Sequence, residues 1–126
     1  MFKLGARSIL RLKGVHPDLV KVVERAIQLT PVDFTVIEGL RTLERQRKMF
    51  DAGASQTLNS RHLTGHAVDL AAWVDNQVDW SWPLYYKIAA AMKSAAKELN
   101  VPLEWGGDWK SFKDGPHFQL PWKDYP

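Results

Sequence analysis

Apolar residues recur at helical spacing in three segments of the chain. Residues 17–29 place their apolar side chains three or four positions apart, behind Pro17 and Asp18. Proline suits the first turn of a helix and an acidic side chain is stabilised near its N-terminus, so this segment predicts an amphipathic helix. Residues 41–53 and the alanine-rich residues 83–100 have similar spacing. We therefore expect three helices.

Four shorter segments have the pattern of strands, because they are β-branched or alternate apolar with polar side chains between residues that favour turns. They are residues 33–40, 66–74, 101–105 and 117–120. Residues 54–65 are expected to form a loop, and residues 75–82 a turn that leads into the long helix. This mixed order predicts a small α+β domain, with a short, mostly antiparallel sheet packed with about three helices. A chain of 126 residues suits one such domain, residues 1–126.

Composition and charge narrow the function classes. The chain contains no cysteine, which excludes disulfides, thiolate metal sites and cysteine nucleophiles, so any metal must be held by histidine and carboxylate. No run of 18 apolar residues and no secretory signal is present, which argues against membrane insertion. The net charge of +3 suits an anionic partner. Basic residues are dispersed without interleaved aromatic residues, so we do not expect nucleic-acid binding.

Three residues, His62, Asp69 and His117, are candidate metal ligands. On the predicted strand, Asp69 shares a face with Ala67 and Ala71, which leaves room beside the carboxylate for a hydrated ion. Two imidazoles and one carboxylate form a three-ligand zinc set with an open position, which is typical of hydrolytic zinc. Such a site favours bound hydroxide near neutral pH.

The same residue types also have simpler interpretations. A histidine in a loop is more often a surface residue or a hydrogen-bonded one than a ligand. His16, ahead of the first predicted helix, is interpreted as a turn or capping residue. His66 adjoins the candidate cluster, and its role stays open between supporting the site and facing solvent. Asp114 lies three residues before His117 and is a candidate base for a bound water.

Three motifs together resemble a known family. SRHLTGHAVDL (60–70) is similar to the S-x-H-x-x-G-x-x-x-D signature of zinc D,D- and L,D-peptidases, and KDGPHFQL (113–120) to their closing acid-x-x-His motif. EGLRTLERQ (38–46) is similar to the arginine-bearing segment that precedes them. The chain most resembles phage endolysins of the L-alanyl-D-glutamate peptidase type, within the VanY-like zinc peptidases, over roughly residues 8–122.

The resemblance implies a role for each matching residue. It implies that His62, Asp69 and His117 bind Zn²⁺ in a cleft and that Asp114 is the general base. Arg41 falls where the family has an arginine that polarises the scissile carbonyl, a role that suits a permanently charged guanidinium. An aspartate at position 114 agrees with the endolysins, since the D-Ala-D-Ala dipeptidases have a glutamate there.

Further residues are expected to contact substrate or to support the site. Ser60 and Gln46 match positions that face substrate or support the site in the family, although either side chain could instead cap or bridge loops. Trp105, Trp109 and Phe112, in the loop before Asp114, are expected to wall the cleft, with at least one of them in the core.

The resemblance implies a zinc-dependent endopeptidase that cuts the L-Ala–D-Glu bond of peptidoglycan stem peptides during host-cell lysis. It further implies a monomer that accumulates in the host cytoplasm and reaches the periplasm and cell wall through a holin-like pore. Two alternatives remain: a D-Ala-D-Ala carboxypeptidase or dipeptidase with the same metal site, and a non-catalytic zinc-containing wall-binding module. A pure binding module has no need for a base at Asp114 or for Arg41, which favours the enzyme.

Overall fold

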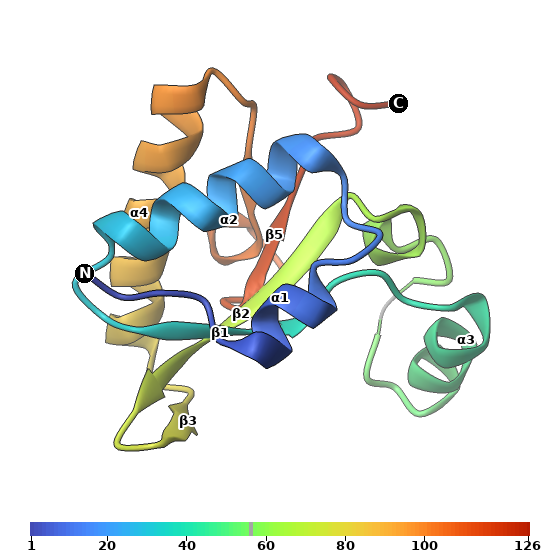
Figure 1. The fold of residues 1–126 in the computed structure, drawn as a ribbon. Coiled ribbons are helices and arrows are strands. Elements are labelled where there is room, and N and C mark those ends of the chain that lie inside the picture. Colours follow the sequence, from blue (N-terminus) through green and yellow to red (C-terminus); the bar gives the residue numbers. More distant parts are fainter. Residues whose placement is uncertain (56) are drawn as a thin grey trace.

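The computed structural model describes residues 1–55 and 57–126, and in them a five-stranded antiparallel sheet packs with helices (Figure 1). The strand order is β1-β2-β5-β4, with β3 paired to β2. The strands are β1 (Phe34–Glu38), β2 (Ala67–Val74), β3 (Gln77–Asp79), β4 (Glu104–Trp105) and β5 (His117–Gln119). The expected α+β class and mostly antiparallel sheet are confirmed.

Four α-helices and two short 3₁₀ turns complete the described fold. They are α1 (Ala6–Arg11), α2 (Pro17–Leu29), α3 (Leu43–Asp51), η1 (Arg61–Thr64), α4 (Trp82–Leu99) and η2 (Gly106–Asp108). The three predicted helices, residues 17–29, 41–53 and 83–100, correspond to α2, α3 and α4. As expected, His16 caps α2, because its Nδ1 accepts a hydrogen bond from the backbone N–H of Asp18 at 3.1 Å.

The hydrophobic core lies between the helix pair α2 and α4 and one face of the sheet. Val68 and Leu70 of β2 and Phe118 of β5 point into it and are fully buried. The alternate residues of the same strands, Asp69 and His117, therefore project from the opposite face. Helix α3 lies apart from α2 and α4 (Figure 1). The sheet thus separates the core from the face that carries the polar cluster.

Several elements differ from the sequence-based expectation: Arg61–Thr64, within the expected loop, form η1, and only Glu104–Trp105 of the expected strand 101–105 form a strand. Helix α1 was not expected, since it has only six residues and buries only Ser8. It is held against β1 because Ser8 Oγ accepts a hydrogen bond from the Val36 N–H and Arg11 Nη1 donates to the Val36 carbonyl. Residues 75–82 do not form a simple turn, because Asp75 and Asn76 both adopt positive φ and return the chain as β3. Two successive residues at positive φ are typical of a tight hairpin turn.

None of the helices in the described residues is long and apolar enough to cross a membrane.

Candidate metal centre

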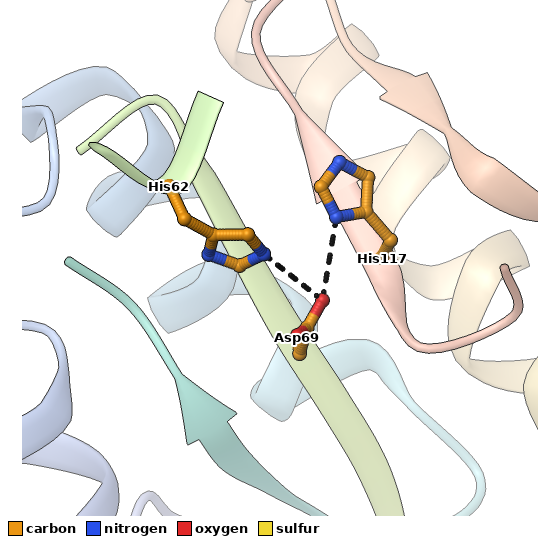
Figure 2. A group of neighbouring side chains, drawn as sticks. All are labelled: His62, Asp69 and His117. Atoms are coloured by element: carbon orange, nitrogen blue, oxygen red, sulfur yellow. Dashed lines mark hydrogen bonds and ion pairs between the residues drawn. The ribbon is translucent and has the colours of Figure 1, made fainter. Parts of the chain in front are cut away.

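Three side chains from separate elements meet on the polar face of the sheet (Figure 2). Asp69 and His117 are direct partners in the register of β2 and β5, and His62 comes from η1. Asp69 Oδ1 lies 3.3 Å from both His62 Nε2 and His117 Nδ1. The potential ligand atoms all lie within 4.8 Å of one another. These residues could therefore hold one metal ion.

The outer nitrogen of each imidazole already has a protein partner. His62 Nδ1 lies 2.9 Å from the carbonyl oxygen of Gly39, which can only accept. His117 Nε2 lies 2.7 Å from Gln119 Oε1, and Gln119 Nε2 donates to Glu104 Oε2 at 3.1 Å, which fixes the orientation of the amide. Both outer nitrogens are therefore donors, so neutral rings present their lone pairs toward Asp69. Such outer partners are typical of metal-binding histidines.

Electrostatics at the cluster favour a cation. Burial opposes ionisation of Asp69, but the hydrogen bonds and positive charge that His117 and His62 supply in their protonated forms outweigh it and hold the pKa of this carboxyl well below its usual range. Burial alone would lower the pKa of His117, yet the Asp69 carboxylate and the Gln119 bond raise it above its ordinary value. A proton is thus attracted to the centre of the cluster. A metal ion bound at the centre of the cluster would replace this proton. Two imidazoles and one carboxylate are a donor set that fits such an ion.

The turn that carries His62 depends on two small residues. Ser60 is its N-cap, and the Ser60 Oγ accepts a hydrogen bond from the His62 backbone N–H at 3.2 Å. Gly65 ends the turn at φ 75°, and a Cβ there would collide with the carbonyl oxygen of Gly14. Only glycine combines that φ with so close an approach. Ser60 also lines the cavity beside the cluster, so it both caps the turn and borders the site.

Arg41 is buried beside the cluster and is oriented by two neighbours. Its Nε and Nη2 donate to the Glu38 carboxylate at 2.8 and 2.6 Å, and its Nη1 donates to Gln46 Oε1 at 2.6 Å. Nη2 also lies 3.7 Å from Asp69 Oδ2. A guanidinium carries five N–H donors, so these three hydrogen bonds leave donors available toward the cavity that Arg41 lines.

A β-bulge places Glu38 where it can hold Arg41. Val36 pairs with Leu70, but Glu38 rather than Ile37 pairs with Asp69, so β1 contains one extra residue at this point. The bulge brings the carboxylate of Glu38 onto the same side as Asp69, with the guanidinium between them.

Gln46 lies behind Arg41 and is fully buried. Its Nε2 donates to Ser55 Oγ at 2.8 Å and to the carbonyl oxygen of Thr57 at 2.5 Å. Gln46 therefore joins Arg41 to the segment that follows α3. This position matches both the support of the site and the bridging of loops that were expected for it, and contact with substrate stays a prediction.

Asp114 lines the cavity that contains the cluster. Its backbone N–H donates to the carbonyl of Gly106, and its own carbonyl accepts from the His117 N–H at 3.2 Å. Burial raises the pKa of Asp114, the charge of Asp69 raises it further, and the net shift is upward despite His117, His62 and Arg41. A raised pKa makes this carboxylate a better proton acceptor.

The cavity has a volume of about 660 Å³ and aromatic residues on its walls. Trp109 lines it, with its ring centroid 5.2 Å from that of His117 and its Nε1 donating to Glu104 Oε2 at 3.1 Å. Phe112 also lines it, is 70% exposed, and has φ 52°, which is uncommon for a bulky residue. Trp105 is instead buried in the core, so the expectation that at least one of the three aromatic residues is in the core is confirmed.

His66 lies outside the cluster. Its Nδ1 is 2.6 Å from Thr64 Oγ1, and its ring packs 5.4 Å from His16 and 6.3 Å from Tyr125. Burial lowers the pKa of His66, and the charges of Arg61 and His16 lower it further. The residue belongs to a separate aromatic group and does not line the cavity in the described part of the chain.

Sequence reasoning missed several supporting groups: the Gly39 carbonyl, Glu38, Glu104 and Gln119. Of these groups, only Gln119 could have been recognised from the sequence, because strand alternation places it on the same face as His117. The others depend on the bulge in β1 and on the pairing of β4 with β5, which join distant segments.

Comparisons with known proteins identify relatives of this chain. Residues 1–120 match the sequence model of the family described as phage L-alanyl-D-glutamate peptidase. The chain is 35% identical over 117 residues to the L-alanyl-D-glutamate peptidase of Escherichia phage T5, covering 90% of this chain and 85% of that protein. The structure is similar to the crystal structure of the Serratia marcescens L-Ala D-Glu endopeptidase ChiX, with 54% identity, a TM-score of 0.94, and coverage of 99% of this chain and 94% of the other.

A more distant neighbour shares the fold. The vancomycin resistance D,D-dipeptidase VanXYg, solved in complex with a D-Ala-D-Ala phosphinate analogue, is 18% identical with a TM-score of 0.56, covering 84% of this chain and 50% of that one. The family match over nearly the whole chain, together with the phage T5 relative, identifies this chain as a member of the phage L-alanyl-D-glutamate peptidase family.

Proposed function

We propose that this chain is a zinc-dependent endopeptidase that hydrolyses the L-Ala–D-Glu bond of peptidoglycan stem peptides during host-cell lysis. The observation that carries the proposal is the convergence of His62, Asp69 and His117 on one point of a cavity that Arg41 and Asp114 also line. The names of the phage T5 and Serratia relatives support the choice of bond.

Zinc is the metal that best suits this donor set. Two neutral imidazoles and one carboxylate, without sulfur, are a common ligand set of hydrolytic zinc. His62 would bind through Nε2 and His117 through Nδ1, since the other nitrogen of each ring donates outward. When bound, zinc supplies a Lewis acid and makes a water molecule acidic enough to yield hydroxide near neutral pH.

The residues of the chain supply the remaining chemistry. Asp114 accepts the proton of the attacking water and delivers it to the leaving amine, a role that its raised pKa favours. Arg41 donates its remaining N–H groups to the scissile carbonyl oxygen as negative charge develops there. Glu38 and Gln46 hold the guanidinium in one orientation, so little rearrangement is needed during the reaction.

The partners and location follow from this activity. We propose that residues 1–126 form a single catalytic domain that acts as a monomer on the peptidoglycan stem peptide, with no nucleic-acid partner. Its net charge of +3 favours approach to an anionic wall. The protein would accumulate in the host cytoplasm and act in the periplasm after release through a holin-like pore.

Mass spectrometry of digested peptidoglycan tests the bond that is cut. We expect stem fragments with a new amino-terminal D-Glu. Release of free D-Ala instead would favour a D-Ala-D-Ala carboxypeptidase or dipeptidase with the same metal site, and binding without any new terminus would favour a wall-binding module.

The assignment of Asp114 has its own test. Asp114→Asn keeps the size of the side chain but removes the base, so we expect about one zinc per chain, an unchanged fold and a loss of turnover of about a hundredfold or more. Metal content by elemental analysis and circular dichroism are the controls. Normal turnover by the variant would show that another group is the base.

A further inference from the structure

The C-terminal segment contributes an aromatic side chain to the cavity. Trp122 lines the same cavity as His62 and Asp114, although it lies beyond residues 1–120, which the family match covers. Trp122 is 47% exposed. A large aromatic side chain left open at the wall of a polar cavity is a candidate contact for a ligand.

Arg61 holds Trp122 in place from one side. The Arg61 Cζ lies 4.0 Å from the centroid of the Trp122 ring, so the guanidinium covers one face of the indole. Nε and Nη2 of Arg61 donate to the Leu120 carbonyl at 3.2 and 3.0 Å, and Nη2 also donates to the Tyr125 carbonyl at 2.6 Å. The exposed area of Trp122 is therefore mainly its other face and edge.

The hydrogen bonds of the Arg61 guanidinium go to backbone carbonyls of the C-terminal segment and not to a carboxylate. Arg61 is only 3% exposed, and within the described residues no carboxylate lies at salt-bridge distance from it. A buried guanidinium without an anionic partner is costly unless carbonyl groups and an aromatic face compensate for the lost water. The segment has a second anchor, because Tyr125 Oη donates to Asp18 Oδ2 at 2.8 Å. Trp122 is thus fixed before any ligand arrives, which lowers the entropic cost of binding.

The residue that contacts the Trp122 indole lies in the same turn as a candidate metal ligand. Arg61 immediately precedes His62, and both lie in η1. Trp122 and the candidate ligand His62 line the same cavity, and Arg61, which contacts the indole, is the neighbour of His62 in one turn.

Among the substrate groups near the scissile bond, one matches a flat apolar surface in the same cavity. The L-Ala–D-Glu bond follows the first residue of the stem, whose amino group is joined to the lactyl group of muramic acid. An extended residue spans about 3.5 Å, so the sugar ring must lie close to the reacting carbonyl. The peptide side chains nearby are a methyl group and a carboxylate, whereas a pyranose ring presents a flat face of C–H groups that packs well on an indole.

We propose that the exposed face of Trp122, held by Arg61, is a saccharide subsite that packs against the muramic acid ring of the substrate. The subsite deepens the proposed function and rests on it. It makes the enzyme favour stem peptides still attached to the glycan over free peptides.

Paired substrates test the subsite. One is N-acetylmuramoyl-L-Ala-D-Glu-diaminopimelate, and the other is the same tripeptide without the sugar. For Trp122→Ala we expect kcat/KM on the muramoyl substrate to fall roughly five- to tenfold through a higher KM, as for the loss of one aromatic contact, with less than a twofold change on the free tripeptide. Trp122→Phe keeps an aromatic face and should restore most of the loss.

Trp80→Ala is the matched control. Trp80 is 57% exposed and lies outside the cavity walls formed by the described residues, so both substrates should be cut as by the wild type. Binding of the muramoyl tripeptide to zinc-loaded Asp114→Asn protein, with and without Trp122→Ala, gives a second readout by calorimetry. There Kd should rise by the same factor.

The outcomes separate the two proposals. If the wild type cuts neither substrate at the L-Ala–D-Glu bond, the proposed function is wrong and the subsite falls with it. If the wild type cuts both and Trp122→Ala affects them equally, or affects neither, the saccharide subsite is wrong while the proposed function stands. A variant that melts more than about 10 °C below the wild type is replaced by Trp122→Phe and Trp122→Leu, which must then differ only on the muramoyl substrate.

Discussion

Replacement of Glu38 by glutamine tests the network that orients Arg41. The Glu38 side chain is 14% exposed and that of Arg41 only 5%. Three hydrogen bonds reach the carboxylate: two from Arg41, at 2.8 and 2.6 Å, and one from Arg45, at 2.8 Å. Glu38→Gln keeps the shape but removes the charge and one acceptor, which leaves a buried guanidinium only partly compensated.

The expected loss of stability follows from the burial of this pair. Removing one partner of a buried ion pair costs about 3–5 kcal/mol, and the glutamine retains one acceptor, so we expect about 2–3 kcal/mol. The bond from the exposed Arg45 adds less than about 1 kcal/mol. At about 2.1 cal/mol/K per residue, the entropy of unfolding of this chain converts that loss into a fall in Tm of about 8–11 °C.

The loss should also depend on pH. Burial would raise the pKa of Glu38, but the bonds and charges of Arg41 and Arg45 outweigh it and leave the pKa below its ordinary value. A lowered pKa in the folded state contributes stability that is complete above the unfolded pKa, about 4.3, and disappears as the pH falls through the folded pKa. The difference in stability between wild type and Glu38→Gln should therefore be largest at neutral pH and shrink below about pH 4.

Differential scanning calorimetry from pH 3 to pH 7 measures both effects. At each pH, the Tm of the wild type is compared with that of Glu38→Gln. Metal release at low pH occurs in both proteins and therefore cancels in this difference. Glu98→Gln is the control, because the Glu98–Arg25 pair is exposed and its loss should cost at most about 1 kcal/mol. A loss for Glu38→Gln no larger than for Glu98→Gln, or one that stays constant to pH 3, would refute the reasoning.

Four further predictions concern the metal centre and the turn beside it. A chelator should abolish peptidoglycan hydrolysis and added Zn²⁺ should restore it; activity that survives metal removal contradicts a metal centre. Gln119→Ala leaves the outer nitrogen of His117 without its partner and should weaken zinc binding about 10- to 100-fold in a competition titration. Gly65→Ala should melt well below the wild type, by several degrees or more, because its Cβ would meet the Gly14 carbonyl. His66→Ala should retain about one zinc per chain, and loss of the metal would place His66 among the ligands.

Local patterns in the sequence were sufficient for the main elements. The apolar spacing of residues 17–29 and 83–100 predicted α2 and α4 to within one residue at each end, since an amphipathic face and a proline in the first turn act over short distances. Residues 117–120 were predicted as a strand, and alternation along it accounts for Phe118 in the core and His117 on the other face. Helix α1 and strand β3 were missed because bonds to β1 and β2, rather than their own side-chain pattern, hold them.

The sequence by itself determined which side chains are available for chemistry, and motif resemblance pointed to His62, Asp69, His117, Asp114 and Arg41. Only the tertiary structure decided how they are held. The pairing of β2 with β5 sets Asp69 opposite His117, although nearly fifty residues separate them. Likewise, the orientations of His62 and Arg41 depend on the Gly39 carbonyl and on Glu38. The physical reason is that these bonds join segments far apart in the chain, whereas sequence periodicity reports only on neighbours within a helix or strand.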